Sequence, residues 1–195
     1  MNPILNRNSF FVKEQIGTWK AANSYDILNP DTNQLLMECR EPNLGFFTKM
    51  FRFTKYKRST PFDVEVNDSM GKRVFRIKRG VSFFRSSVEV YDEHESLVGK
   101  FRQRLLSLGG KFDLNNSEGQ LLFTLEGKWS NFDYTFKRGD ETLGMITKKW
   151  MGIGKELFTS ADNYIITIEP TMAATDTNRI LIVASAVCID MVYYE

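Results

Sequence analysis

Alternating apolar and polar positions run through the middle of the chain. In the stretch FDVEVNDSMGKRVFRIKRG (residues 62–80), Phe62, Val64 and Val66 stand two residues apart. Val74, Phe75 and Ile77 supply the apolar positions after a polar turn at 67–71, and period-two spacing is typical of half-buried β-strands. Similar pairs of runs around polar turns follow at residues 87–104, 110–128 and 132–149. With a spacing of about 24 residues, the pattern predicts a meander of antiparallel hairpins.

Shorter runs at both sides of this region add further strands. They are SFFVKEQIG (9–17), SYDILNP (24–30), QLLMECR (34–40) and NYIITIEP (163–170). The total is eleven to thirteen strands, and no long polar stretch separates them, so we expect a single domain over residues 1–195. A meander with so many strands is expected to close on itself, because closure removes exposed edges.

The most apolar stretch is NRILIVASAVCIDMVYYE, residues 178–195. It is short for a spanning helix, which needs about 20 apolar residues, and it contains Asp190. A buried strand is the third alternative, but the run is long and never alternates. A helix that is apolar on all sides belongs in a core. We therefore favour a helix over 180–192 that fills the barrel, with the membrane span and the buried strand as alternatives.

Composition is that of a soluble globular protein, with 42% hydrophobic and 26% charged residues. The formal net charge is only +2, but residues 43–104 carry fourteen Lys or Arg against seven Asp or Glu. This asymmetry indicates one face that meets an anionic partner, either lipid headgroups or nucleic acid. The alternative is a basic surface with no specific partner. Two distant cysteines, Cys39 and Cys188, fit a reducing compartment, and we expect no secretory signal, so the predicted location is cytoplasmic.

The segment LGFFTKMFRFTKYKR (44–58) is the main candidate site. Phe46, Phe47, Met50 and Phe51 fall on one face of a helix, and basic amphipathic segments with aromatics lie in membrane interfaces. The alternative is that the Phe face plugs the barrel while the charges are solvated. A second basic cluster lies on the 62–80 hairpin and its exit: Lys72, Arg73, Arg76, Lys78, Arg79 and Arg85. Arg76 and Lys78 alternate with Phe75 and Ile77 and should point outward. The candidate lipid-headgroup residues are Lys49, Arg52, Lys55, Lys57, Arg58, Arg76 and Lys78.

Catalytic chemistry has little support in the sequence. His94 is the only histidine and lies in the charged turn YDEHES, without neighbours at metal-ligand spacing. There is no Gly-x-Ser-x-Gly motif, no Cys–His pattern and no complete phosphate-binding loop, and no nucleic-acid recognition motif accompanies the basic residues. We expect no enzyme activity, no cofactor, no metal site and no nucleic-acid partner.

Two stretches, 143–168 and 180–195, resemble the phospholipid scramblases, as does the 61–80 hairpin with its pattern Pro-Phe-x-x-x-x-x-Asp-x-x-Gly. The specific residues are the Gly144-x-Ile146-x-Lys148-x-Trp150-x-Gly152 run, Glu156-x-Phe158-Thr159-x-Ala161-Asp162-Asn163, and Ile189-Asp190. Similar features occur in plant LURP-one-related proteins, and the Tubby C-terminal domain has the same architecture. The resemblance covers nearly the whole chain in layout. It implies a mostly β fold, a closed antiparallel barrel of about 12 strands around a hydrophobic C-terminal helix.

The resemblance also implies a function at membranes that contain anionic phospholipid. Scramblases are linked to calcium-stimulated movement of phospholipids, and Tubby-type barrels bind phosphoinositide headgroups. In this sequence, the family's acidic loop reads Ser160, Asp162 and Thr171 where the family has three carboxylates, and the cysteine-rich run is absent from the 45–58 region. We therefore predict peripheral binding, or transbilayer movement, of anionic phospholipid at the cytoplasmic membrane face, without a tight calcium site. The alternative is a soluble scaffold of the same fold that binds a protein partner and has no lipid activity.

Overall fold

The computed structural model describes residues 2–15, 24–42, 60–80, 87–104, 111–128, 133–148 and 163–193. These residues form a short 3₁₀ helix η1 (Pro3–Asn6), twelve strands and the helix α2 (Arg179–Tyr193). The strands are β1 (Ser9–Glu14), β2 (Tyr25–Leu28), β3 (Leu35–Arg40), β4 (Phe62–Asp68), β5 (Arg73–Arg79), β6 (Ser87–Asp92), β7 (Leu97–Gln103), β8 (Lys111–Asn115), β9 (Leu121–Lys128), β10 (Asp133–Arg138), β11 (Glu141–Thr147) and β12 (Asn163–Ile168).

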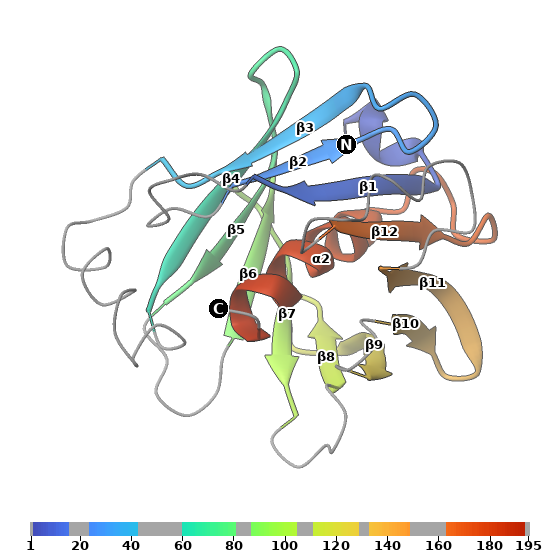
Figure 1. The fold of residues 1–195 in the computed structure, drawn as a ribbon. Coiled ribbons are helices and arrows are strands. Elements are labelled where there is room, and N and C mark those ends of the chain that lie inside the picture. The colour runs from blue at the N-terminus through green and yellow to red at the C-terminus, as the bar shows by residue number, and fades with distance from the viewer. Residues whose placement is uncertain are drawn as a thin grey trace.

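Each strand pairs antiparallel with its neighbours along the chain, and β1 pairs with β12 to close the barrel (Figure 1). Inward and outward residues alternate as expected. In β4, for example, Phe62, Val64 and Val66 are buried while Asp63 and Glu65 are half-buried on the outer face. The prediction of a closed, mostly β barrel of about 12 strands is confirmed.

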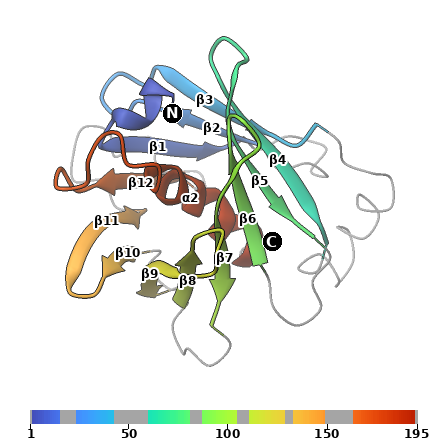
Figure 2. The same cartoon turned by 180° about the vertical axis from the view of Figure 1, so that it is seen from behind.

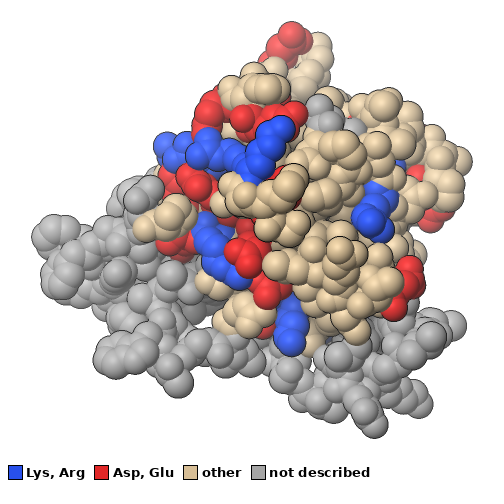
Figure 3. Space-filling view, turned by 90° about the horizontal axis from the view of Figure 1, so that it is seen from above, with Lys and Arg blue, Asp and Glu red and all other residues tan. Residues whose placement is uncertain are grey.

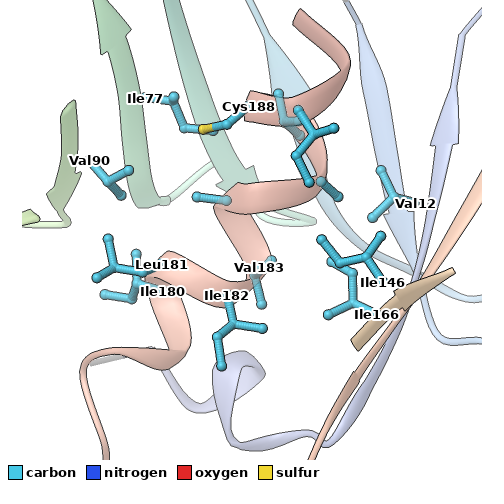
Figure 4. Close-up of a cluster of buried hydrophobic side chains, with 14 of the residues drawn as sticks. Val12, Ile77, Val90, Ile146, Ile166, Ile180, Leu181, Ile182, Val183 and Cys188 are labelled. Carbon is cyan, nitrogen blue, oxygen red and sulfur yellow. The ribbon is translucent and has the colours of Figure 1, made fainter. Parts of the chain in front are cut away.

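Helix α2 lies inside this barrel, with strands on all sides of it in both views (Figures 1 and 2). Every residue from Ile180 to Met191 is buried. Leu181 points toward Val90 of β6, and Cys188 lies beside Ile77 of β5 (Figure 4). The prediction that the apolar tail forms a central helix is therefore confirmed. The described residues of the tail form neither a buried strand nor a membrane span in this structure. Among the described residues, no helix combines the length and the apolar character that crossing a bilayer requires.

One glycine makes room for the helix. Gly99 of β7 is buried, and a Cβ atom there would lie 3.0 Å from Leu181 Cδ1 and 2.6 Å from the carbonyl oxygen of Asn115. Real Cβ atoms hardly ever come this close to a backbone oxygen. The absence of a side chain at this position is thus a requirement of the packing between the wall and α2.

The same turn closes three successive hairpins, 24 residues apart. Its first residue is Asp68, Asp92 or Asn116, whose side-chain oxygen accepts the backbone N–H groups two and four residues later at 2.8–3.1 Å. Three residues after each of them the backbone is left-handed, with φ of 78°, 61° and 86° at Gly71, Glu95 and Gly119. Such side-chain-to-backbone bonds explain why Asp or Asn occupies the first position of each of these turns.

The alternating connections of the meander divide between the two ends of the barrel. We call one the turn end: it holds the six connections 29–34, 69–72, 93–96, 116–120, 139–140 and 169–178, all of them described. The opposite end, where β1, β3, β5, β7, β9 and β11 finish, is called the far end. Helix α2 begins at the turn end, directly after 169–178, and runs through the barrel toward the far end.

Candidate functional site

Five of the seven predicted headgroup residues, Lys49, Arg52, Lys55, Lys57 and Arg58, lie outside the described residues, as do Phe46, Phe47 and Phe51. The other two, Arg76 and Lys78, lie on β5. As expected, they alternate with the buried Phe75 and Ile77, with Arg76 half-buried and Lys78 exposed on the outer face. The outer face of β5, with the strands next to it, is therefore the part of the candidate site that the structure describes.

Arg76 is engaged by acidic residues from two other elements. Its Nε and Nη2 atoms each donate to a different carboxylate oxygen of Asp63 at 2.6 Å, and Nη1 lies 3.2 Å from both carboxylate oxygens of Glu95. The hydrogen bonds to Asp63, together with the charges of Asp63 and Glu95, raise the pKa of Arg76. Arg73 joins the network through Glu65 at 2.9 Å and through Glu95. The positive charge of Arg76 is thus largely compensated within the fold.

Lys78 faces a second, less compensated network. Its cross-strand neighbour on β6 is Glu89, whose carboxylate already accepts from Lys100 at 2.7 Å and from Tyr91 Oη at 2.7 Å. The hydrogen bonds from Lys100 and Tyr91 lower the pKa of Glu89, and the bond to Glu89 raises the pKa of Tyr91 to about 12. Because Glu89 is shared with Lys100, Lys78 leaves a positive charge at the surface.

Arg102 is a further surface cation, which the sequence analysis did not select. It is exposed on β7, beside Ser87 on one side and Asp113 on the other. Asp113 is already held by Arg104, with Nη2 to Oδ1 at 2.6 Å, and within the described part of the chain Arg102 forms no salt bridge. Lys78 and Arg102 stand on either side of β6 and two residues apart along the strands. Their Cα atoms are about 12 Å apart if strands are spaced by about 4.8 Å and residues by about 3.4 Å. The alternation around the buried Phe101 is the sequence signal that could have identified Arg102 as an outward-facing residue.

The predicted second basic cluster is only partly a surface feature. Arg79 faces inward and is 3% exposed. Its Nη2 atom donates to the carbonyl oxygen of Thr60 at 2.6 Å, and its guanidinium lies 4.6 Å from the ring centroid of Phe62. Arg79 is therefore a packed group at the far end of the barrel interior and does not add to the surface charge.

Two polar groups anchor α2 inside the barrel. Near its end, the Asp190 carboxylate accepts from Tyr25 Oη at 2.6 Å and from Tyr164 Oη, and Lys148 lies over the Tyr164 ring at 5.3 Å. At its start, the buried Arg179 donates to the backbone around η1. Asp190 belongs to the residues that resemble scramblases, and its position gives it a structural explanation: the carboxylate is satisfied by strands β2 and β12.

Metal ligands do not gather in the described part of the chain. No three His, Cys, Asp or Glu residues come together there. His94 lies in the β6–β7 turn with 79% of its side chain exposed, which agrees with its place in the charged stretch YDEHES. Thr171 is exposed, whereas Ser160 and Asp162 lie outside the described residues, so the prediction about calcium stays a prediction.

The two sets of sequences that connect the strands differ in charge. The six connections of the turn end contain seven Asp or Glu and one Lys. The other six connecting sequences (15–24, 41–61, 80–86, 104–110, 129–132 and 148–162), most of whose residues lie outside the described part of the chain, contain eleven Lys or Arg and three Asp or Glu, and also all three tryptophans. Around the strands themselves charge is mixed, with basic and acidic groups interleaved over the face in Figure 3.

Comparison with known proteins gives the family. The Scramblase family model matches residues 4–195. The chain belongs to the Scramblase family. A phospholipid scramblase family protein of Schizosaccharomyces pombe is 22% identical over 97% of this chain and 54% of its own length. The altered inheritance rate of mitochondria protein 25 of Saccharomyces cerevisiae is 24% identical over 98% of this chain and 70% of its own length.

A third relative matches over a shorter region. Phospholipid scramblase 1 of Rattus norvegicus is 28% identical over 54% of this chain and 36% of its own length. The chain therefore spans about half the length of the Schizosaccharomyces pombe relative and about a third of the rat protein. The family assignment agrees with the resemblance seen in the sequence.

Proposed function

We propose that this scramblase-family protein binds the surface of membranes that contain anionic phospholipid, through the basic residues of segment 44–58 together with Lys78 and Arg102. The observation that carries the proposal is membership of the Scramblase family, since two of the matched relatives are named phospholipid scramblases. The uneven charge described above supports it, because juxtamembrane cations are each attracted to an anionic surface by about 1 kcal/mol.

The buried state of α2 supports a peripheral mode of binding. The most apolar segment of the chain is enclosed by the barrel wall, so its side chains from Ile180 to Met191 are not available to the bilayer. Attraction to the membrane then comes from surface cations, with aromatic side chains of segment 44–58 entering the headgroup boundary. Arg76 contributes less than the sequence alone suggests, because Asp63 and Glu95 already compensate its charge.

Sedimentation with lipid vesicles tests the proposal. Vesicles of phosphatidylcholine mixed with phosphatidylserine should carry the protein down at low salt, and vesicles of phosphatidylcholine alone should not. Binding should weaken sharply as salt rises, because screening acts over about 8 Å at physiological ionic strength. If the protein ignores the anionic vesicles even at low salt, the lipid proposal is wrong.

A pair of charge-matched variants localises the binding. Replacing Lys49, Arg52 and Lys55 with Gln should weaken binding by up to about a hundredfold, at about 1 kcal/mol for each charge. The control replaces Lys72, Lys137 and Arg138 with Gln. This variant also loses three positive charges, but near the turn end. Equal losses in the two variants would mean that only net charge matters and that the basic segment is not the site.

Transbilayer movement of lipid is a separate step and needs its own assay. Fluorescent phospholipid in the outer leaflet of vesicles is bleached by dithionite, and a protein that moves lipids raises the bleached fraction above half. A soluble protein-binding scaffold is the alternative function, favoured by the mixed and largely paired charges on the outer face of β4–β7. This alternative predicts that neither vesicle assay responds.

A further inference from the structure

We infer that the barrel meets the membrane end-on, with its far end toward the bilayer and the turn end toward the aqueous phase. This inference rests on the proposed function and adds to it the orientation of the bound molecule. Helix α2 would then stand with its C-terminal end directed at the membrane. The alternative arrangements are a barrel lying on its side or one standing on its turn end.

The turn end is unsuited to an anionic surface. Its six connections are fully described, and Asp31, Glu118 and Asp140 are exposed on three different turns. Glu95 is exposed on a fourth turn, but Arg73 and Arg76 offset its charge. These acids therefore surround this end of the barrel instead of forming one patch. Arg7 and Arg138 lie close by and offset part of the negative charge, but the connections themselves hold seven acids against one Lys. A membrane rich in anionic lipid repels this surface.

Among the described residues, cations without an acidic partner lie toward both ends: Arg7, Lys137 and Arg138 near the turn end, and three more toward the far end. Lys13 of β1, Lys78 of β5 and Arg102 of β7 are each exposed, and each stands within two residues of the point where its strand ends at the far end. None of the three forms a salt bridge within the described part of the chain. Lys78 and Arg102 share the β5–β7 side of the barrel, whereas Lys13 lies on β1, four strands from β5. A flat anionic surface that approaches end-on can attract all three, whereas a surface along the β5–β7 side attracts only two.

The length of the barrel makes the orientation matter. Helix α2 has 15 residues and spans about 22 Å at 1.5 Å per residue. With a screening length of about 8 Å, the repulsion from acids at that distance falls below about a tenth of its contact value. End-on docking by the far end therefore keeps the attraction of the cations and removes nearly all of the repulsion. The partial charges of the α2 dipole have the opposite sense, but they amount to only about half a charge at each end.

Labels at the two ends test the orientation. Gln15→Cys places a thiol just after β1, at the far end, and Ser117→Cys places one in the β8–β9 turn; both positions are exposed. The native Cys39 and Cys188 are buried, and burial raises the pKa of both thiols, so a thiol-reactive dye should label the new sites selectively. Each labelled protein is bound to vesicles of phosphatidylcholine with phosphatidylserine, and quenching by acrylamide is measured with and without vesicles.

End-on docking predicts that vesicles reduce quenching at position 15 by about threefold or more and leave position 117 unchanged. Equal protection at both positions, or greater protection at 117, overturns the orientation while sedimentation still supports lipid binding. Failure to sediment overturns the proposed function itself, and the orientation with it.

Two single-charge variants give an independent test of the orientation. Arg102→Gln and Arg138→Gln remove one exposed charge each, from the two opposite ends of the barrel. We expect Arg102→Gln to weaken binding several-fold and Arg138→Gln to change it by less than about twofold, because its distance from the bilayer exceeds the screening length. The reverse order of the two effects contradicts the inference.

Discussion

Replacement of Arg179 by methionine is expected to destabilise the protein strongly. Arg179 is the first residue of α2 and is 0% exposed. Its guanidinium donates to the carbonyl oxygens of Leu5 (2.7 Å), Met172 (3.0 Å) and Arg7 (2.5 Å) and to Asn8 Oδ1 (2.7 Å). One side chain thus joins the N-terminal segment, the β12–α2 connection and the helix at the turn end.

The size of the loss in stability follows from the hydrogen bonds that methionine cannot form. Its thioether cannot donate, so the carbonyl oxygens of Leu5 and Met172, in buried bonds, and that of Arg7, in a part-buried one, lose a partner. Each unsatisfied buried group costs about 1–3 kcal/mol. Part of this cost is recovered because burial already disfavours the charged guanidinium, which lowers the pKa of Arg179. Three such groups, less the recovered desolvation, give a net cost of about 3–5 kcal/mol, which corresponds to a fall in Tm of roughly 6–20 °C for a protein of this size.

Thermal unfolding followed by circular dichroism measures the effect, with Arg138→Met as the matched control at an exposed position. The control should change the free energy of unfolding by less than about 0.5 kcal/mol. Arg179→Lys keeps the charge but presents its donors from a single nitrogen, so its Tm should fall between those of the wild type and Arg179→Met. A fall in Tm below about 2 °C for Arg179→Met would show that the four hydrogen bonds contribute little beyond the desolvation they offset.

Three further predictions concern the rest of the fold. Deleting the residues after Asn178 removes α2 and should yield insoluble or unfolded protein, because each large aliphatic side chain loses about 1.5–3 kcal/mol of burial; a soluble truncated protein that unfolds cooperatively would contradict the central role of the helix. Gly99→Val forces a branched side chain against Leu181 and should lower Tm, by an amount that a smaller partner in the double variant with Leu181→Ala partly restores. The pKa of Asp68 is lowered mainly by the backbone N–H of Lys72, so its stabilising effect is present above about pH 4 and is lost as pH falls through the lowered pKa. Asp68→Asn should therefore flatten the loss of stability on acid titration, and an unchanged slope would refute this assignment.

Local patterns of residues along the sequence were sufficient to predict most of the fold. Period-two alternation identified strands such as β4 and β5, turn residues identified the hairpins, and the lack of any polar face on 180–192 identified the central helix. Each of these features depends on a few consecutive residues, so a single sequence is enough to identify it. Closure of the barrel followed from the number of strands, since the alternative was two exposed edges.

Side-chain partners across strands could not be predicted in the same way. That Arg76 meets Asp63 and Glu95 depends on the register of β4 against β5 and on the β6–β7 turn, both set by the whole barrel. Arg79 was grouped with the basic cluster of the 62–80 hairpin because its neighbours in sequence are basic, but the pleat turns it inward. Arg102 was missed because its importance lies in what surrounds it, namely an Asp113 already taken by Arg104.

The position of α2 in the chain has a consequence for folding during synthesis. The helix follows all twelve strands, and the closing pair of the barrel joins β1 to β12. At roughly 5–20 residues per second, the inner faces of the strands leave the ribosome many seconds before the segment that will cover them. Contacts between distant parts of a chain form slowly, and half-built sheets offer open edges and apolar surface to other chains. A nascent chain of this kind is a natural client for chaperones until Arg179 and the residues after it have emerged, and stalling translation just before that point should leave the chain bound to them.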